Sequence, residues 1–177
     1  MRVITGTARG KRLETMSGDS VRPTAERIKE AIFSIIQFDI PCRNVLDLFA
    51  GSGQLGIEAL SRGAESAVFI DNSNDSLEVI KRNLKNTDLQ KSAIVFNSNY
   101  SSYLLTCKSK FDIAFLDPPY NAGLLLDALH KTTAAMNEHG IILCEHPSSF
   151  EMPEEDGEFK LKKQYRYGKI MVSLYTC

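Results

Sequence analysis

The chain has 177 residues, of which 43% are hydrophobic and 24% charged, as is typical of one globular domain with a substantial core. No apolar run approaches the roughly 18 residues that a membrane-spanning helix needs, and the first residues lack the apolar block of a signal peptide. The four cysteines are scattered, with no CxxC pair and no ligand spacing shared with the three histidines. We therefore expect a cytoplasmic protein with reduced thiols and no metal.

Residues 1–22 are predicted to form a small β-rich arm, with glycines marking its turns. The arm has little apolar content, and its first twelve residues hold four basic side chains and no acidic one. Residues 158–169 hold five basic side chains and one acidic one. On a chain with a net charge of −1, two such segments could form one phosphate-facing surface, although ordinary solvated charge is the alternative.

A helix is predicted from Thr24, its N-cap, to about Phe38, because isoleucines recur on one face at helical spacing. Strands and helices then alternate. The predicted strands are 44–49, 66–70, 93–97, 111–116 and 140–145, and the predicted helices are 55–62, 74–86, 101–106 and 122–136. Two closing strands, 159–166 and 169–175, would form an antiparallel edge hairpin. This order predicts an α/β domain over residues 23–177, with an open parallel sheet covered by helices on both faces.

A glycine-rich loop joins the first predicted strand to its helix. Its sequence, Asp47-Leu48-Phe49-Ala50-Gly51-Ser52-Gly53-Gln54-Leu55-Gly56, contains the G-x-G-x-x-G pattern. Such a loop turns tightly and lets a ligand approach the backbone, both in nicotinamide-dinucleotide sites and in methyl-donor sites. Asp47 favours the methyl donor, because a carboxylate would attract the cationic amine of a methionine moiety and repel a pyrophosphate.

Polar residues also follow the second and third predicted strands. Asp71 comes about twenty residues after the glycine loop, where a carboxylate accepts hydrogen bonds from the two ribose hydroxyls of NAD or of S-adenosylmethionine (SAM). Asn72 could flank the ribose or the adenine. Asn99 and Tyr100 follow the third strand, at the position that faces adenine in a SAM site. An asparagine that only turns the chain is the alternative for Asn99.

The fourth strand ends in Asp117-Pro118-Pro119-Tyr120. Two prolines cannot continue a strand ladder, so the chain must expose this end. A carboxylate and a carbonyl can together accept both protons of a planar amino group, and a tyrosine can stack on the ring that bears it. The motif therefore predicts a site for the exocyclic amine of a nucleobase, which must be unpaired or flipped to reach it. A tight turn with a capping aspartate is the alternative.

Together with Arg22-Pro23-Thr24-Ala25-Glu26-Arg27 and the glycine loop, this motif resembles the RsmD-type family of bacterial 16S rRNA (guanine-N2) methyltransferases. The resemblance runs from Arg2-Val3-Ile4-Thr5-Gly6 to Tyr167-Gly168. It implies a Rossmann-like class I SAM-dependent methyltransferase fold. It also implies methylation of a guanine 2-amino group, with 16S ribosomal RNA or a small-subunit assembly intermediate as the partner.

The motifs and the resemblance together predict three sets of residues. The catalytic set is Asp117, Pro118 and Tyr120; the cofactor-binding set is Asp47, Phe49, Ala50, Gly51, Gly53, Asp71, Asn72, Asn99 and Tyr100; and the RNA-binding set is Arg9, Lys11, Arg12, Arg22 and Arg27. The chain departs from the family at three places. Gln54 replaces a small residue and could crowd the loop, Asn99 replaces an aspartate, and Gly168-Lys169-Ile170 replaces Gly-Asp-Thr.

Three other functions are compatible with parts of this pattern. An adenine-N6 methyltransferase would also use the Asp117–Tyr120 motif, although the chain offers no separate target-recognition domain. An NAD(P)-dependent oxidoreductase would use the glycine loop but not that motif. A catalytically silent RNA-binding protein would not need the intact motif.

Overall fold

The computed structural model describes residues 1–16, 23–119 and 122–177. The strands are β1 (Asn44–Asp47), β2 (Ser66–Asp71), β3 (Ala93–Asn97), β4 (Phe111–Leu116), β5 (Met136–Pro147), β6 (Glu155–Asp156), β7 (Phe159–Tyr167) and β8 (Ile170–Thr176). The helices are α1 (Pro23–Ile35), α2 (Gln54–Ser61), α3 (Asn74–Thr87), α4 (Tyr100–Thr106) and α5 (Ala122–Thr133), with a short 3₁₀ turn, η1 (Gln90–Ser92).

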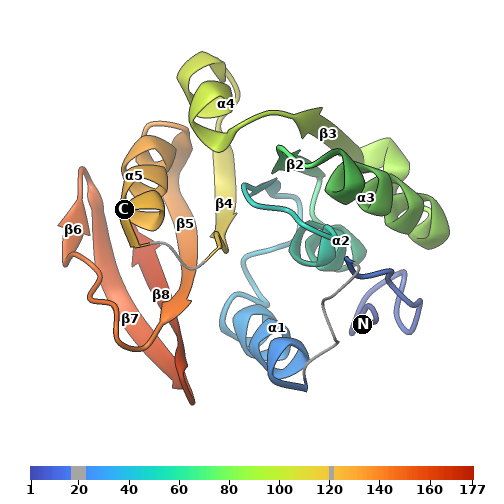
Figure 1. Ribbon diagram of the computed structural model, residues 1–177, viewed down its shortest axis with the longest axis horizontal. Coiled ribbons are helices and arrows are strands. Elements are labelled where there is room, and N and C mark those ends of the chain that lie inside the picture. The colour runs from blue at the N-terminus through green and yellow to red at the C-terminus, as the bar shows by residue number, and fades with distance from the viewer. Residues whose placement is uncertain (17–22, 120–121) are drawn as a thin grey trace.

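Within this part of the chain the strands form one eight-stranded sheet in the order β3-β2-β1-β4-β5-β8-β7-β6 (Figure 1). Strands β1 to β5 pair with one another in parallel, whereas the pairs β5–β8, β8–β7 and β7–β6 are antiparallel. The predicted parallel sheet with a C-terminal antiparallel hairpin is therefore confirmed.

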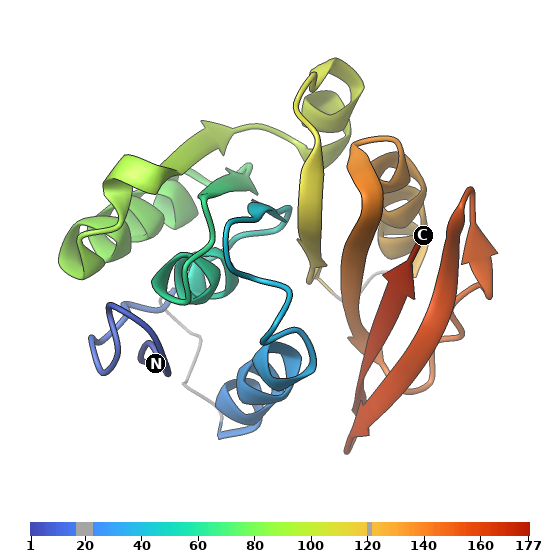
Figure 2. The same cartoon turned by 180° about the vertical axis from the view of Figure 1, so that it is seen from behind.

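Helices cover both faces of the sheet, as predicted (Figure 2). Along β4, Ile113 and Phe115 belong to the core shared with α1, α2 and α3, and Ala114 and Leu116 to the core shared with α4 and α5. Successive side chains of a strand point to opposite faces, so a strand covered on both sides must be apolar almost throughout. This explains the continuous apolar run that ends at Asp117.

The structure corrects two predicted helix ends. Helix α1 ends at Ile35, and Phe38, predicted as its last residue, is 89% exposed in the turn that follows. Helix α5 ends at Thr133, and Met136, predicted as helical, begins β5. A turn in which the Ala135 N–H donates to the Thr132 carbonyl separates the two elements. In both places the apolar pattern continues past the residue where the backbone leaves the helix.

The N-terminal arm is more firmly anchored than its composition suggests. Val3, Ala8 and Leu13 are buried in the core beside α1 and α2, which corrects the expectation that the arm contributes little to the core. In residues 1–16, β structure is limited to one antiparallel bridge between Arg2 and Arg12. Burial of apolar side chains and contacts with α2 therefore hold these residues in place.

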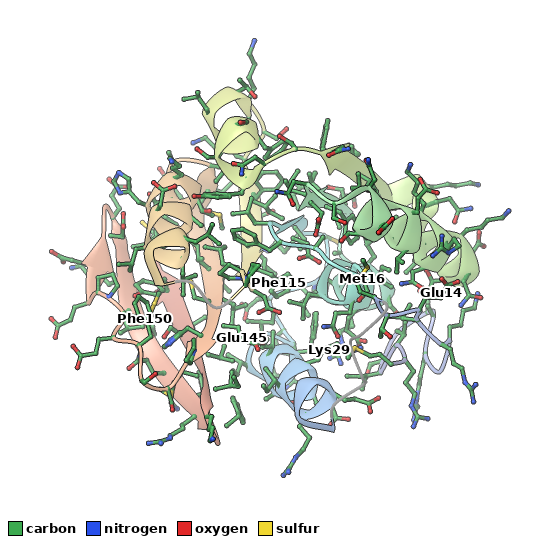
Figure 3. The ribbon with its side chains drawn as sticks, viewed as in Figure 1. Glu14, Met16, Lys29, Phe115, Glu145 and Phe150 are labelled. Atoms are coloured by element: carbon green, nitrogen blue, oxygen red, sulfur yellow. The ribbon has the colours of Figure 1, made fainter. Side chains whose placement is uncertain are left out.

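A buried carboxylate fastens the arm to the domain. Glu58 of α2 is fully buried, and its two oxygens accept hydrogen bonds from the N–H groups of Ile4 (2.8 Å) and Thr5 (3.0 Å). Its charge is compensated by Arg62, at 2.8 Å, and by Lys29, at 3.5 Å. Lys29, labelled between α1 and the arm in Figure 3, also donates to the Arg2 carbonyl at 2.6 Å. Burial lowers the pKa of Lys29, and the charge of Glu58 opposes this change, so loss of Glu58 would leave Lys29 without its ion-pair partner in the interior.

The two basic segments of the sequence are not neighbours. Figures 1 and 2 show the arm beside α2 and α3, and the β7–β8 hairpin on the opposite flank of the sheet, with α1 between them. A phosphate-facing surface that used both segments would have to cross α1.

Candidate cofactor and active site

The distinctive residues gather where the order of the sheet reverses. Strands β1 and β4 are parallel neighbours, with Asp47 opposite Phe115. The chain leads from β1 toward β2 and β3 on one side, and from β4 toward β5 on the other. Ligands of open α/β sheets bind at this switch point, outside the carboxyl ends of the strands. Asp47 and Asp117 lie at the two strand ends that border it.

The glycine loop turns tightly into α2. Gly53 is the N-cap of α2 with φ = 76°, and Gly51 has φ = 53°, both in the left-handed region that favours glycine. Gly56 has a different role, because a Cβ at this position would lie 2.3 Å from the Phe69 ring of β2. The third glycine of the motif thus allows the helix to pack closely on the sheet.

Asp47 lies beneath this loop and is 2% exposed. Its Oδ2 accepts a hydrogen bond from the Gly56 N–H at 2.9 Å. Its pKa is raised to about 7, chiefly by burial; the Gly56 N–H opposes the change, and the negative charges of Asp117 and Asp71 contribute to it. The structure therefore places three carboxyl groups close enough to act on one another electrostatically.

Asp71 connects the end of β2 to the glycine loop. Its Oδ2 accepts from the Gly51 N–H at 2.8 Å, and its Oδ1 accepts from the Ser73 N–H at 2.9 Å. A carboxylate offers about four acceptor positions, so both oxygens retain the capacity to accept from a ligand. Asp71 thereby shapes the loop and faces the cavity at the same time.

The third strand end presents an aromatic ring. The Tyr100 hydroxyl donates to Asp127 of α5 at 2.7 Å, which raises the Tyr100 pKa to about 12. Its ring packs on Phe49 with a centroid separation of 5.2 Å. Asn99 is the N-cap of α4, and its side-chain Oδ1 accepts from the Ser101 N–H at 2.9 Å. This side chain therefore helps to turn the chain into α4, while the residue also lines the cavity. Asp127 was not anticipated, because it lies 27 residues from Tyr100 in the sequence.

Asp117 follows β4 with its carboxylate inside the site. Burial raises its pKa to about 6. Among the described residues, none donates a hydrogen bond to this carboxylate, in contrast to those of Asp47 and Asp71. Pro118 is buried beside it, and Pro119 is exposed. Tyr120 lies outside the described residues.

These elements enclose a cavity of about 570 Å³. Of the predicted site residues, the structure brings together Phe49, Ala50, Gly51, Asp71, Asn72, Asn99, Tyr100, Asp117 and Pro118 in its lining. Asp47 and Gly53 support the loop from below and do not line it. The sequence-based prediction did not include Leu48, Ser52, Gln54, Ser76, Ser98, Pro119 and Leu124, which also line the cavity. No lysine or arginine occurs among the described lining residues, so the cavity is lined by carboxylates without a compensating cation.

A second cavity, of about 440 Å³, lies between the arm and α1. It is lined by three arginines, Arg2, Arg9 and Arg27, together with Glu26 and Glu30 and residues of the arm backbone. Arg2 lies 3.7 Å from Glu26, whereas Arg9 and Arg27 form no ion pair with any described residue. The structure thus brings together Arg9 and Arg27, two of the predicted RNA-binding residues.

The other predicted RNA-binding residues are placed differently. Lys11 and Arg12 are exposed on the arm outside this cavity. Arg22 lies outside the described residues. In the described ranges, no helix is both long and apolar enough to cross a membrane, and no group of three or more His, Cys, Asp or Glu side chains is arranged to hold a metal ion.

Solved structures identify the class of protein that this fold and site define. An Escherichia coli structure described as "Putative methyltransferase yhhF" superimposes with a TM-score of 0.89, at 31% identity over 99% of this chain and 97% of that chain. A hypothetical protein of Thermus thermophilus superimposes with a TM-score of 0.84, at 27% identity over 98% of each chain. The protein is an α/β, Rossmann-like methyltransferase.

Sequence comparisons identify the family. Residues 1–176 match the family described as "Conserved hypothetical protein 95". The chain is 38% identical, over 99% of its length and 98% of the relative's, to "Putative rRNA methyltransferase YlbH" of Bacillus subtilis. It is 30% identical to "Ribosomal RNA small subunit methyltransferase D" of Escherichia coli K12, over 99% of this chain and 89% of that protein. The chain belongs to this family, the RsmD-type family that its motifs resemble.

Proposed function

We propose that this protein transfers a methyl group from SAM to the 2-amino group of a guanine in small-subunit ribosomal RNA. The observation that carries the proposal is the Asp117 carboxylate, which lies beside Pro118 in the cavity and accepts no hydrogen bond from the described protein. The relatives named above as rRNA methyltransferases support the RNA substrate.

The residues of the first cavity fit SAM better than a dinucleotide. SAM carries a positive sulfonium and a positive ammonium group, and the carboxyl groups of Asp47, Asp71 and Asp117 act on this region without a lining lysine or arginine. The pyrophosphate of NAD(P) would meet those charges unfavourably. Asp71 would accept from the ribose hydroxyls, and the Tyr100 ring would pack against the adenine.

The proposed chemistry is a direct displacement. Bound SAM would supply an electrophilic methyl group on its sulfonium. The guanine amine is a poor nucleophile, because its lone pair is delocalised into the ring. Asp117 and the Pro118 carbonyl would accept its two protons, which favours tetrahedral geometry at nitrogen. The carbon–nitrogen bond would form as the carbon–sulfur bond breaks, and one amine proton would leave to Asp117 or to solvent. Because the two reacting groups meet in one direct step, correct positioning of the amine and the methyl group supplies much of the rate acceleration.

RNA binding is assigned to the N-terminal arm, residues 1–22, attached to the methyltransferase domain of residues 23–177. Arg9 of the arm and Arg27 of α1 line the cavity between the two, and neither forms an ion pair with a described residue, although Glu26 and Glu30 line the same cavity. Such side chains bind backbone phosphate and position the RNA, while the first cavity would bind the target base.

The test is methyl transfer from tritiated SAM to unmethylated small-subunit ribosomal RNA, offered naked and within the subunit, followed by nucleoside analysis. We expect label in N2-methylguanosine. Label in N6-methyladenosine would support the adenine-N6 alternative instead. Absence of transfer to any RNA, together with absence of SAM binding, would overturn the proposal.

A further inference from the structure

Asn83 of α3 holds two segments of the chain at once. It is 1% exposed. Its Oδ1 accepts a hydrogen bond from the Glu14 N–H at 2.8 Å, and its Nδ2 donates to the Glu14 carbonyl at 3.0 Å and to the Ser52 carbonyl at 2.9 Å. Glu14, labelled beside α3 in Figure 3, belongs to the N-terminal arm, and Ser52 belongs to the glycine loop. One buried amide therefore joins the arm to the loop.

On the loop side, Asn83 fixes a peptide group at the border of the cofactor site. Ser52 lines the first cavity and lies between Gly51 and Gly53, both of which have a left-handed backbone. Because glycine can adopt many backbone conformations, such a loop depends on contacts with its neighbours to keep one of them. Asp71 holds the Gly51 N–H, and Asn83 holds the Ser52 carbonyl. The shape of the loop at the cavity thus depends on the position of the Asn83 amide.

On the arm side, Asn83 helps to dock a short segment, residues 12–14, on α3. Asn86, which lies one turn further along the same helix, donates to the Arg12 carbonyl at 2.7 Å. Arg12 is exposed and belongs to the predicted RNA-binding set. An RNA phosphate bound to Arg12 would therefore restrain the segment that Asn83 holds.

We propose that Asn83 is a positioning residue that couples RNA binding on the arm to SAM binding in the first cavity. Its amide is planar, so the two N–H groups that bind Glu14 and Ser52 keep a fixed geometry relative to each other. RNA on the arm would restrain this amide from one end, and SAM beside the glycine loop would restrain it from the other. The ligand that binds second loses less conformational freedom and binds more tightly, and by linkage the effect is equal in both directions. This inference rests on the proposed function, because it takes SAM and RNA as the two ligands.

The experiment measures the affinity for S-adenosylhomocysteine, which has no methyl group to transfer, without and with saturating unmethylated small-subunit ribosomal RNA. In the unaltered protein we expect the RNA to raise this affinity about fivefold or more, which is the lower end of typical coupling between two sites. In Asn83→Ala the RNA should have no effect on the affinity, because the arm and the loop no longer share a side chain. A residue that only stabilised the fold would change the melting temperature without changing this ratio.

Asn86→Ala is the matched control. It removes an asparagine from the same helix and a hydrogen bond to the arm, at the Arg12 carbonyl, but it leaves the bond between Asn83 and Ser52 in place. This variant should bind RNA more weakly and still show the increase in affinity for S-adenosylhomocysteine.

A measurement on the unaltered protein decides the question even if Asn83→Ala does not fold. S-adenosylhomocysteine should slow hydrogen exchange of the Glu14 amide, which donates to Asn83. The Thr7 amide is the reference, because it donates to the Ser61 carbonyl of α2 at 2.8 Å. We expect the protection of the Glu14 amide to increase several-fold more than that of the Thr7 amide.

Three results would overturn the inference: no effect of RNA in the unaltered protein, an increase that persists in Asn83→Ala, or an increase that is lost equally in both variants. Equal changes in protection at Glu14 and Thr7 would overturn it as well. If the unaltered protein binds no S-adenosylhomocysteine or no RNA, the proposed function itself fails, and the inference fails with it. Methylation of guanine without coupling between the two ligands would leave the proposed function standing and remove the inference alone.

Discussion

The cavity at the strand ends and the cavity beneath the N-terminal arm differ in the charges that line them. The first is bordered by carboxyl groups with no described lysine or arginine in its lining, and burial raises the pKa of two of them, Asp47 and Asp117. The second is lined by three arginines and two glutamates, and two of the arginines lack a described ion-pair partner. A cationic cofactor and a polyanionic substrate would thus be recognised by different regions, and a near-neutral chain can bind both.

The largest expected effect of a substitution in the first cavity is at Asp117. Asp117→Ala should lower the rate of methyl transfer about 100- to 1,000-fold, the usual range for losing a group that stabilises developing charge. Asp117→Asn keeps one acceptor oxygen without the charge and should lie between Ala and the unaltered protein. Single-turnover rates at saturating SAM measure both. Because no described group depends on this carboxylate, the melting temperature should change little. An unaltered rate in Asp117→Ala would remove this residue from the mechanism.

The next largest effect is expected at Asp71. Asp71→Ala should weaken SAM binding by about 1–3 kcal/mol, because a charged acceptor for the ribose hydroxyls is lost. The same change removes the bonds from Gly51 and Ser73, so the melting temperature should also fall. Calorimetric titration with SAM at a temperature where the variant is folded separates the two effects. Equal SAM affinity there would show that the ribose lies elsewhere.

The arm provides the corresponding test of the second region. Replacing Arg9, Lys11 and Arg12 by alanine should weaken RNA binding and reduce its dependence on salt by about two to three units of slope, while SAM affinity stays the same. A matched variant that replaces Lys160, Lys162 and Lys163 of β7 removes the same charge from the opposite flank of the sheet. A larger loss in this second variant would place the RNA interface on the hairpin rather than on the arm.

The smallest expected effect concerns pH. Burial raises the pKa of Asp47 to about 7 and that of Asp117 to about 6 in the ligand-free protein, so both carboxyl groups are partly protonated below neutrality. A cationic ligand favours their ionised forms, so SAM affinity should increase several-fold from about pH 5.5 to 7.5, with protons released on binding. Calorimetry in buffers of different ionisation enthalpy measures this release. Affinity that falls as pH rises would contradict the proposed role of the carboxylates.

The same carboxyl groups affect the stability of the ligand-free protein in the opposite direction. Their folded-state pKa values are raised, so between about pH 4 and pH 7 the folded protein binds more protons than the unfolded chain. The free energy of unfolding should therefore decrease as pH rises through this range. With SAM bound, the free energy of unfolding should decrease less steeply as pH rises.

Much of the fold was predictable because the central strands β1, β2 and β4 are apolar almost throughout and two prolines follow the end of β4. The residues at the strand ends were predictable for the same reason: Asp71 and Asp117 each follow such a run directly. Contacts between distant segments could not be read from the sequence. Nothing local indicates that Asp127 binds Tyr100, that Glu58 holds the arm, or that Asp47 turns away from the cavity to bind Gly56. These depend on how α2 and α5 pack against the sheet.

Helix α2 begins at the first cavity and ends beneath the arm, and this has a consequence for the order in which the protein is assembled. The backbone of the arm is held by Glu58 and Ser61, which follow Ile4 and Thr5 by 54 and 56 residues. The arm is synthesised before α2, yet the hydrogen bonds that Ile4 and Thr5 make to Glu58 and Ser61 cannot form until α2 has been synthesised and has folded. We expect pulse-labelled hydrogen exchange to show protection of the Ile4 and Thr5 amides no earlier than that of α2. The newly made chain would thus acquire its proposed RNA-binding surface only after α2, the helix that also borders its cofactor site, has formed.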